Sequence, residues 1–274
     1  MNRAVFVLAL LITLPSHALQ VSVSPTETLE IAERSAVVKI DGKLDEAVWA
    51  SLDQYDEFVV IEPDTLVKPA HATWVSLFYN QLGLYVGVQV EQPPETRIAR
   101  LSSRDNRQIK RDSVGMVLDT SGEGRYGYWF GINLGDAQMD GTLLPEKQFT
   151  SDWDGAWEGA TSETQTGWTA EMFIPWGVVS MPKQAGARRI GLYMERFVAY
   201  KDERWSWPAL PDTVPQFISA LQSVSVKDVQ PKQQYSIFPS ASVTQDQIDG
   251  KTNYRAGADF FWRPSTNLQL TATI

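Results

Sequence analysis

The chain has 274 residues, a formal net charge of −9 at pH 7, no cysteine and two histidines. The absence of cysteine excludes a disulfide framework, a thiolate nucleophile and any sulfur-ligated metal site. The acidic balance argues against a duplex nucleic-acid partner, which would require clustered Lys and Arg. The length suits one large all-β domain, or one domain and a piece of another.

The N-terminus has the pattern of a cleaved signal peptide over residues 1–18. Arg3 is followed by an apolar run at 4–14, and Ser16 and Ala18 supply small residues. Because the run is too short to span a bilayer as a helix, we expect the mature protein to begin near Leu19. The mature protein would then be secreted across the inner membrane, to the periplasm or the outer membrane. Residues 19–36 are predicted to be a linker or a lead-in strand.

Short elements follow from residue 37. The pattern predicts a strand at 37–40, a tight turn at Asp41-Gly42 and a short helical turn at 44–49, whose buried face holds Leu44 and Val48. Apolar residues alternate over 73–79 and 84–90, which predicts a hairpin with a four-residue loop. Residues 113–118 predict another strand, which ends at Asp119. His71 lies before the hairpin and is interpreted as an ordinary surface or packing histidine.

The clearest strand pattern lies between Glu123 and Trp176, a span with five of the ten tryptophans. Residues 126–132 and 168–174 alternate with a period of two. Residues 135–141 and 163–167 are rich in Gly, Asp, Thr and Gln, which favour turns. This region therefore predicts antiparallel strands with aromatic residues on both faces.

Several motifs lie between residues 40 and 175: IDGKLDEAVW at 40–49, LYVGV at 84–88, Arg104-Asp105, Asp112, Asp119, and GWTAEMFIP at 167–175. Together they resemble the family 9 carbohydrate-binding-module-like domain. More specifically, they resemble bacterial surface proteins in which this domain precedes an outer-membrane β-barrel of unknown function. It covers roughly residues 37–229 and implies an antiparallel β-sandwich. In sugar-binding members, tryptophans sandwich a terminal sugar ring and polar side chains fix its hydroxyls.

Two pairs of tryptophans are candidates for such a site. Trp205 and Trp207 are two apart, so on an extended segment they would face one side, about 6 to 7 Å from each other. Trp153 and Trp157 are four apart and would also share a face, with carboxylates beside them to accept hydrogen bonds from hydroxyls. The alternative is that these rings are core or rim packing. The candidate ligand-binding residues are Trp205, Trp207, Trp153, Trp157, Asp154 and Glu158.

A catalytic site has less support, and no catalytic residue is assigned. A glycosidase needs two carboxylates about 5 to 9.5 Å apart, and no motif pairs any two here. The acidic residues of the recognised motifs and strand ends are as easily structural acceptors: Asp112, Asp119, Glu158 and Glu171. No cofactor is predicted, although one acidic group could bind calcium; its spacing fits no EF-hand loop and favours a solvated loop. That group is Asp136, Asp140, Asp152 and Asp154. The basic cluster at 100–111 is interpreted as a solvated face.

Three functional classes remain open. The first is a noncatalytic carbohydrate-binding module of the cell envelope, which binds a glycan on aromatic side chains and is accessory to carbohydrate breakdown. The second is a periplasmic plug or gating domain of an outer-membrane β-barrel protein. A glycoside hydrolase is the third.

The tail, residues 230–274, has a different pattern. After Pro231-Lys232, residues 235–240 alternate, and from Tyr254 to Arg263 a near-apolar face lies opposite a mostly polar one. Such faces are typical of transmembrane β-strands. Three strands cannot close a barrel, so we expect the start of a truncated β-barrel domain, packed loosely beside the sandwich. The alternative is an ordinary soluble hairpin.

Overall fold

The computed structural model describes residues 27–182, 184–211, 213–229, 234–245, 252–265 and 268–274. The predicted signal peptide and the Pro231-Lys232 break lie outside these residues. Within them the chain is all-β, as expected, with strands and four 3-10 helices and no α-helix. No helix in this part of the chain is long and apolar enough to cross a membrane. The 3-10 helices are η1 (Trp49–Ser51), η2 (Pro94–Thr96), η3 (Pro145–Lys147) and η4 (Ile218–Ala220).

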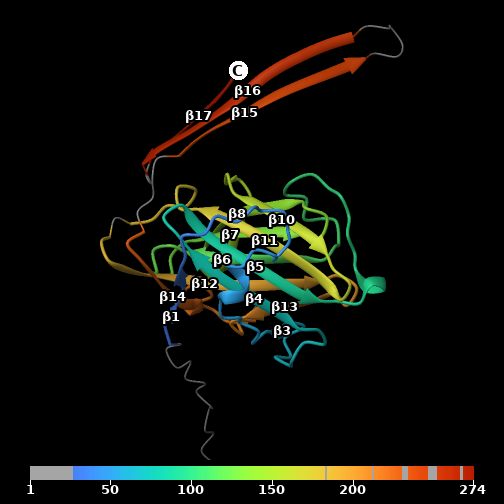
Figure 1. Ribbon diagram of the computed structural model, residues 1–274, viewed down its shortest axis with the longest axis vertical. Helices are drawn as coiled ribbons and strands as arrows, with labels where there is room; N and C mark the ends of the chain where they lie inside the picture. Colours follow the sequence, from blue (N-terminus) through green and yellow to red (C-terminus); the bar gives the residue numbers. More distant parts are fainter. Residues whose placement is uncertain (1–26, 183, 212, 230–233, 246–251, 266–267) are drawn as a thin grey trace, which may run out of the picture.

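The larger of two packed sheets has nine strands among the described residues (Figure 1). Its main path runs β1 (Leu29–Glu30), β14 (Gln222–Lys227), β12 (Ala187–Val198), β6 (Ser113–Asp119), β7 (Gly127–Asn133), β8 (Gln138–Leu144) and β9 (Gln148–Thr150). Off this path, β13 (Glu203–Trp207) pairs with β12 and with β3 (Val59–Glu62).

The smaller sheet of the sandwich has five strands in the described ranges. Its order is β10 (Glu158–Glu163), β11 (Gly167–Pro175), β5 (Gly83–Glu91), β4 (Thr73–Tyr79) and β2 (Ala32–Glu33). The predicted hairpin is confirmed as β4 and β5. Its turn is closed by Asn80, whose Oδ1 accepts hydrogen bonds from the backbone N–H groups of Leu82 and Gly83 at 2.8 and 3.2 Å.

The main core fills the space between the two sheets. Strand alternation sends Tyr128, Phe130 and Ile132 of β7 into it, and Val86 and Val88 of β5 meet them from the other sheet. The other faces of both sheets are covered as well. One smaller cluster packs residues 36–52 on the five-stranded sheet, and another packs residues 210–221 on the nine-stranded sheet. The predicted antiparallel β-sandwich is therefore confirmed.

The 41–42 turn is fastened to β11 by a buried carboxylate. Glu171 Oε2 accepts hydrogen bonds from the backbone N–H groups of Asp41 and Gly42, at 3.0 and 2.9 Å. Gly42 has φ +83°, and a Cβ at this position would lie 2.4 Å from the carbonyl carbon of Thr161. Only glycine fits both the backbone angle and the close approach. Two of the motifs that carried the family resemblance thus form one structural clamp.

Two sequence-based predictions of local structure were wrong. Residues 37–40 pair with no strand, and Val38 and Ile40 instead pack their side chains with η1 on the five-stranded sheet. The predicted turn at 135–141 is shorter, because β8 begins at Gln138 and pairs with β7. Glycine and aspartate in that stretch suggested a longer loop, but Asp140 and Gly141 belong to the sheet.

The tail forms a third sheet, β15 (Gln234–Gln245), β16 (Thr252–Ser265) and β17 (Leu268–Thr273). Figure 1 shows this sheet extending away from the sandwich, so the expected packing beside it is not seen. Its register aligns apolar residues across the strands: Ile237 with Phe260, Val243 with Tyr254, and Trp262 with Leu270. Many apolar side chains remain exposed, including Tyr235, Ile237, Val243, Tyr254 and Leu270.

Candidate ligand-binding site

A pocket of about 210 Å³ lies between the loop that precedes β6 and the outer face of the nine-stranded sheet. The loop contributes residues 106–111. The sheet contributes Trp129 of β7, Met139 of β8, Glu195 of β12 and Arg204 of β13. Pockets for drug-sized ligands are usually about 300–1,000 Å³, so this one suits a smaller molecule.

Two glycines lie on the sheet beside Glu195 and Trp129. Glu195 lies opposite Gly115 of β6, which lies opposite Gly131 of β7. A Cβ on Gly131 would come within 2.7 Å of the Trp129 ring. The indole can therefore lie across this part of the sheet only because the neighbouring residue has no side chain. A large apolar ring and a carboxylate are thereby placed side by side on a sheet face.

Glu195 is held in the pocket from two sides. Its Oε1 accepts a hydrogen bond of 3.0 Å from the indole Nε1 of Trp129, and its Oε2 lies 3.2 Å from a guanidinium nitrogen of Arg204. Arg204 also contacts Glu62, at 3.2 Å. The negative charges of Glu195 and then Glu62 raise the pKa of the Arg204 guanidinium above its usual range. Glu195 and Arg204 therefore form a fixed polar wall, and Glu62 supports Arg204 from outside the pocket.

Arg107 lies over the pocket with only aromatic contacts. Its guanidinium carbon is 4.0 Å from the centre of the Phe149 ring and 5.3 Å from that of Trp129. Among the described residues it makes no hydrogen bond and no ion pair. Stacking on an aromatic ring uses the face of a guanidinium, so its in-plane N–H donors are left for a ligand.

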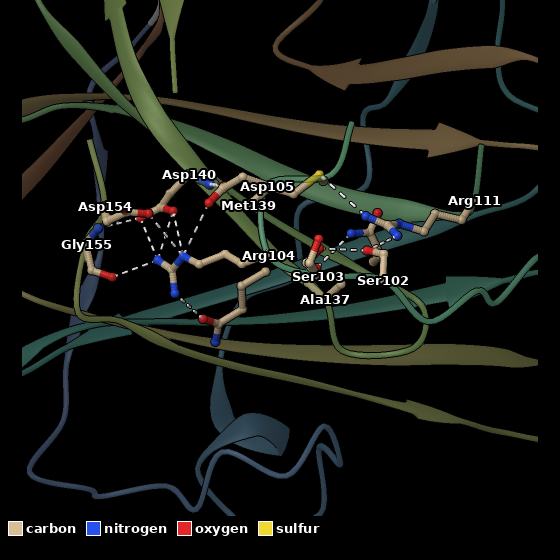
Figure 2. Close-up of polar contacts among 12 residues, drawn as sticks. Ser102, Ser103, Arg104, Asp105, Arg111, Ala137, Met139, Asp140, Asp154 and Gly155 are labelled. Atoms are coloured by element: carbon tan, nitrogen blue, oxygen red, sulfur yellow. Dashed lines mark hydrogen bonds and ion pairs between the residues drawn. The ribbon is translucent and has the colours of Figure 1, made fainter. Parts of the chain in front are cut away.

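Arg111, at the end of the same loop, is buried, with 2% of its surface exposed. It donates hydrogen bonds to the hydroxyl of Ser102, the carbonyl of Asn106 at 2.8 Å and the sulfur of Met139 at 4.0 Å (Figure 2). All three acceptors are neutral, and its Nε has no partner among the described residues. Burial lowers the pKa of this guanidinium. The interpretation of 100–111 as a solvated basic face was wrong at this position.

Beside the pocket, Arg104 takes the central position among three carboxylates (Figure 2). Its Nη2 donates to both carboxylate oxygens of buried Asp140, each at 2.8 Å, and to the carbonyl of Gly155, also at 2.8 Å. Asp105 and Asp154 lie 3.6 and 3.5 Å from its Nε. The guanidinium compensates part of the negative charge of these three carboxylates and fixes the start of the loop that carries Arg107.

The four aspartates considered as calcium ligands do not converge. Asp136 binds the backbone N–H and hydroxyl of Thr161, and Asp152 binds Thr150. Only Asp140 and Asp154 come together, at Arg104. Asp140 is buried, so the prediction of a solvated loop was wrong for it. Burial raises the pKa of Asp140, and its hydrogen bonds to Gly155 and Arg104 oppose that shift.

A second pocket, of about 260 Å³, lies at the turn after β6. The carboxylate of Asp119 is on its wall, but that carboxylate already accepts hydrogen bonds from the backbone N–H groups of Ser121, Gly122 and Gly124. No aromatic ring lines this pocket. It therefore lacks the surface on which a sugar ring could pack.

Neither a protein-family model nor a curated protein matches the sequence. Solved structures do match. A family 9 carbohydrate-binding module from Caldicellulosiruptor kristjanssonii, in complex with cellotriose, has a TM-score of 0.51 at 15% identity over 74% of this chain and 95% of that one. The complex of such a module from the same organism with glucose has a TM-score of 0.51 at 15% identity, over 75% of this chain and 97% of that one. A proposed carbohydrate-binding protein from Bacteroides uniformis ATCC 8492 has a TM-score of 0.57 at 13% identity, over 73% of this chain and 99% of that one. The chain has the fold of a family 9 carbohydrate-binding module.

In this family 9 fold, Trp205 and Trp207 do share one side of a strand, but that side faces the core. Trp205 is fully buried, 4.7 Å from the buried guanidinium of Arg196. Trp207 is buried too, and its ring stacks on Tyr55 at 4.8 Å. The expected platform open to solvent is therefore wrong, because β13 lies between β12 and β3 and turns both rings inward.

The other predicted pair lies at the edge of the same core. Trp157 is buried against Phe130, with ring centres 5.6 Å apart, and half-buried Trp153 is 5.8 Å from Phe130. These two rings are core and rim packing in the family 9 fold. Asp154 is exposed beside Arg104, and Glu158 is exposed at the start of β10. The structure does not gather the six predicted residues into one pocket.

The pocket residues Trp129, Glu195 and Arg107 were missed by the sequence-based reasoning. One signal was present in the sequence, since Trp129 stands between Gly127 and Gly131 on one face of a strand. A large ring between two glycines indicates a place where a sheet face is kept open for a ring or a ligand. Nothing in the local sequence connects that face with Glu195, 66 residues away.

Proposed function

We propose that this chain is a noncatalytic carbohydrate-binding module and that the sugar binds in the pocket at Trp129. The observation that supports the site is the meeting of an indole ring, a fixed carboxylate and arginine side chains in one small cavity. Sugar-binding sites need an apolar surface for the ring and a few fixed polar groups for the hydroxyls. The shared fold with sugar-bound family 9 modules supports the same class of ligand.

Each wall of the pocket has a role in this proposal. Trp129 and Met139 are buried, with 9% and 7% of their surface exposed, so they provide a small apolar surface at the bottom of the pocket. Glu195 has carboxylate lone pairs beyond those used by Trp129 and Arg204, so it can accept hydrogen bonds from hydroxyls. The ion pair of Glu195 with Arg204 holds both side chains in place before the ligand arrives, which reduces the entropy lost on binding.

The test compares Glu195→Gln with Glu62→Gln, using calorimetry against a panel of mono- and oligosaccharides. Both changes remove a carboxylate from Arg204, but only Glu195 lines the pocket. We expect Glu195→Gln to weaken sugar binding at least about tenfold and Glu62→Gln to leave it almost unchanged. Equal affinities in the two variants would place the site elsewhere. If no sugar in the panel binds, the proposed function is wrong.

The noncatalytic part of the proposal needs its own test. Incubation with the oligosaccharides that bind should release no new reducing ends. Sustained release, lost on changing a carboxylate of this chain, would instead support a glycoside hydrolase.

A second proposal concerns the tail sheet: we propose that β15 to β17 are strands of an outer-membrane β-barrel, with the sandwich in the periplasm as its plug or gating domain. The observation that favours it is the aligned, exposed apolar face formed by β15, β16 and β17, with Arg255 and Asp259 on the opposite face of β16. A lipid-facing surface opposite a polar one is what membrane strands require.

Lipid contact can be measured through Trp262, which lies on that apolar face opposite Tyr235. The full chain would be reconstituted in vesicles with brominated acyl chains, which quench nearby indoles. We expect quenching in the unaltered protein and much less in Trp262→Phe, while Trp205→Phe serves as the control in the buried core. Quenching that is unchanged by Trp262→Phe would contradict membrane insertion of this sheet.

A further inference from the structure

The pocket at Trp129 is positively charged, although the chain as a whole is acidic. Five ionisable side chains line it, of which Arg107, Lys110, Arg111 and Arg204 are basic and Glu195 is acidic. Since the formal net charge of the chain is −9, the positive excess is local to this pocket.

Two of the four cations already have carboxylate partners. Arg204 pairs with Glu195 as described above, and Lys110 Nζ lies 2.7 Å from a carboxylate oxygen of Asp202. Within the described part of the chain, no carboxylate contacts Arg107 or Arg111. Two arginines of one loop therefore make no ion pair at the same cavity, and Arg107 feels the charges of Glu195 and Asp105 only from a longer distance.

The two arginines differ in how they are held. Arg111 is almost completely buried, and a buried charge is unfavourable unless an opposite charge compensates for it. Arg107 is exposed and free of hydrogen bonds, with its guanidinium stacked on Phe149. A guanidinium fixed by its face presents two parallel N–H donors at its edge, the geometry that matches a carboxylate or a sulfate.

We propose that the ligand of this pocket is an acidic sugar, in which a carboxylate or sulfate group binds to Arg107 and the ring lies beside Trp129. Arg111 supplies the second positive charge from beneath. This inference rests on the proposed function of the same pocket and adds the class of sugar. A neutral sugar would leave both cations without an anionic partner.

The experiment measures calorimetric binding of four probes to the full chain: D-glucuronate, D-glucose 6-sulfate, D-glucose and D-glucuronamide. The amide matches the shape of the carboxylate without its charge. We expect at least one anionic sugar to bind at least about tenfold more tightly than the neutral probes, and the better of the two identifies the acidic group. The preference should weaken with added salt.

Arg107→Gln should abolish the preference for the anionic sugar. Arg125→Gln is the matched control, since it removes the same charge from an exposed side chain that does not line the pocket. Thermal unfolding of both variants checks that they fold. Arg107→Lys keeps the positive charge but loses the two parallel N–H donors of the guanidinium, so it should retain part of the preference.

Three results would overturn the inference. If neither glucuronate nor glucose 6-sulfate binds more tightly than glucose, the acidic class is excluded but a carbohydrate-binding pocket remains. A preference that survives Arg107→Gln excludes the arginine as the anion's partner. Binding of none of the four probes contradicts both this inference and the proposed function.

Discussion

The indole Nε1 of Trp49 donates a hydrogen bond of 3.0 Å to Oε1 of Glu171, which lies 122 residues further along the chain. The other carboxylate oxygen holds the turn at Asp41 and Gly42. One fully buried carboxylate therefore receives three N–H donors. Two of the motifs that gave the family resemblance, at 40–49 and 167–175, encode this fold contact, which lies under residues 36–52 on the five-stranded sheet and away from the pocket.

We expect Trp49→Phe to lower the free energy of unfolding by about 1–3 kcal/mol, because it leaves a buried carboxylate oxygen without its donor. Trp74→Phe is the control, since half-buried Trp74 has no hydrogen bond from its indole among the described residues. Urea denaturation of both variants gives the comparison. Equal losses would mean that ring volume, and not the hydrogen bond, explains the effect.

Stability should depend on pH through Glu171. Burial raises the pKa of this carboxyl from 4.5 to about 7, and its hydrogen bonds from Asp41 and Gly42 oppose the shift. The folded state thus binds more protons than the unfolded state between these values. The contribution of Glu171 to the unfolding free energy is fully present below about pH 4.5. It falls by up to about 3 kcal/mol as the pH rises through 7.

Comparison with Glu171→Gln isolates this effect. The variant cannot titrate at this position, whereas His71, whose pKa burial lowers, is present in both proteins and cancels. The unfolding free energy of the unaltered protein minus that of the variant should therefore fall, by up to about 3 kcal/mol, as the pH rises from 4.5 to 7.5. A constant difference would show that Glu171 does not change its protonation in this range.

Trp205→Ala should destabilise the sandwich by about 3–5 kcal/mol, because it opens a cavity in the core and exposes the face of buried Arg196. Chemical denaturation measures the loss. A variant that kept the stability of the unaltered protein but lost sugar binding would restore Trp205 as a binding residue.

Removal of residues 230–274 should leave the unfolding of the sandwich unchanged. None of the core clusters of the described residues contains a side chain beyond Val229. The shortened chain should unfold cooperatively, within a few degrees of the full chain's midpoint, in a thermal scan followed by circular dichroism. A loss of cooperativity would mean that the tail supports the sandwich.

Local patterns predicted the fold better than the site. The β4–β5 hairpin follows from alternation around Asn80, whose side chain closes its own turn. Alternation also showed that Trp205 and Trp207 share a side. Which side faces inward depends on β3 and β12, and a period of two carries no information about such distant strands.

The pocket could not be predicted for the same reason. Its carboxylate, its ring and its free guanidinium come from β12, β7 and a loop, which meet only through sheet order. The charge of the loop was visible in the sequence, but the burial of Arg111 was not. Burial of a charged side chain is decided by what packs over it.

The short strands near the N-terminus affect how the sandwich can fold. Leu29 pairs with Val224 in one sheet, Ala32 pairs with Phe78 in the other, and Ile31 between them enters the core. β1 therefore receives its partner only when the last strand of the sandwich, β14, is present. Contacts between such distant segments slow folding. In a chain emerging in N-to-C order, the five-stranded sheet has all its strands by Pro175, but the nine-stranded sheet stays incomplete until residue 227 is available.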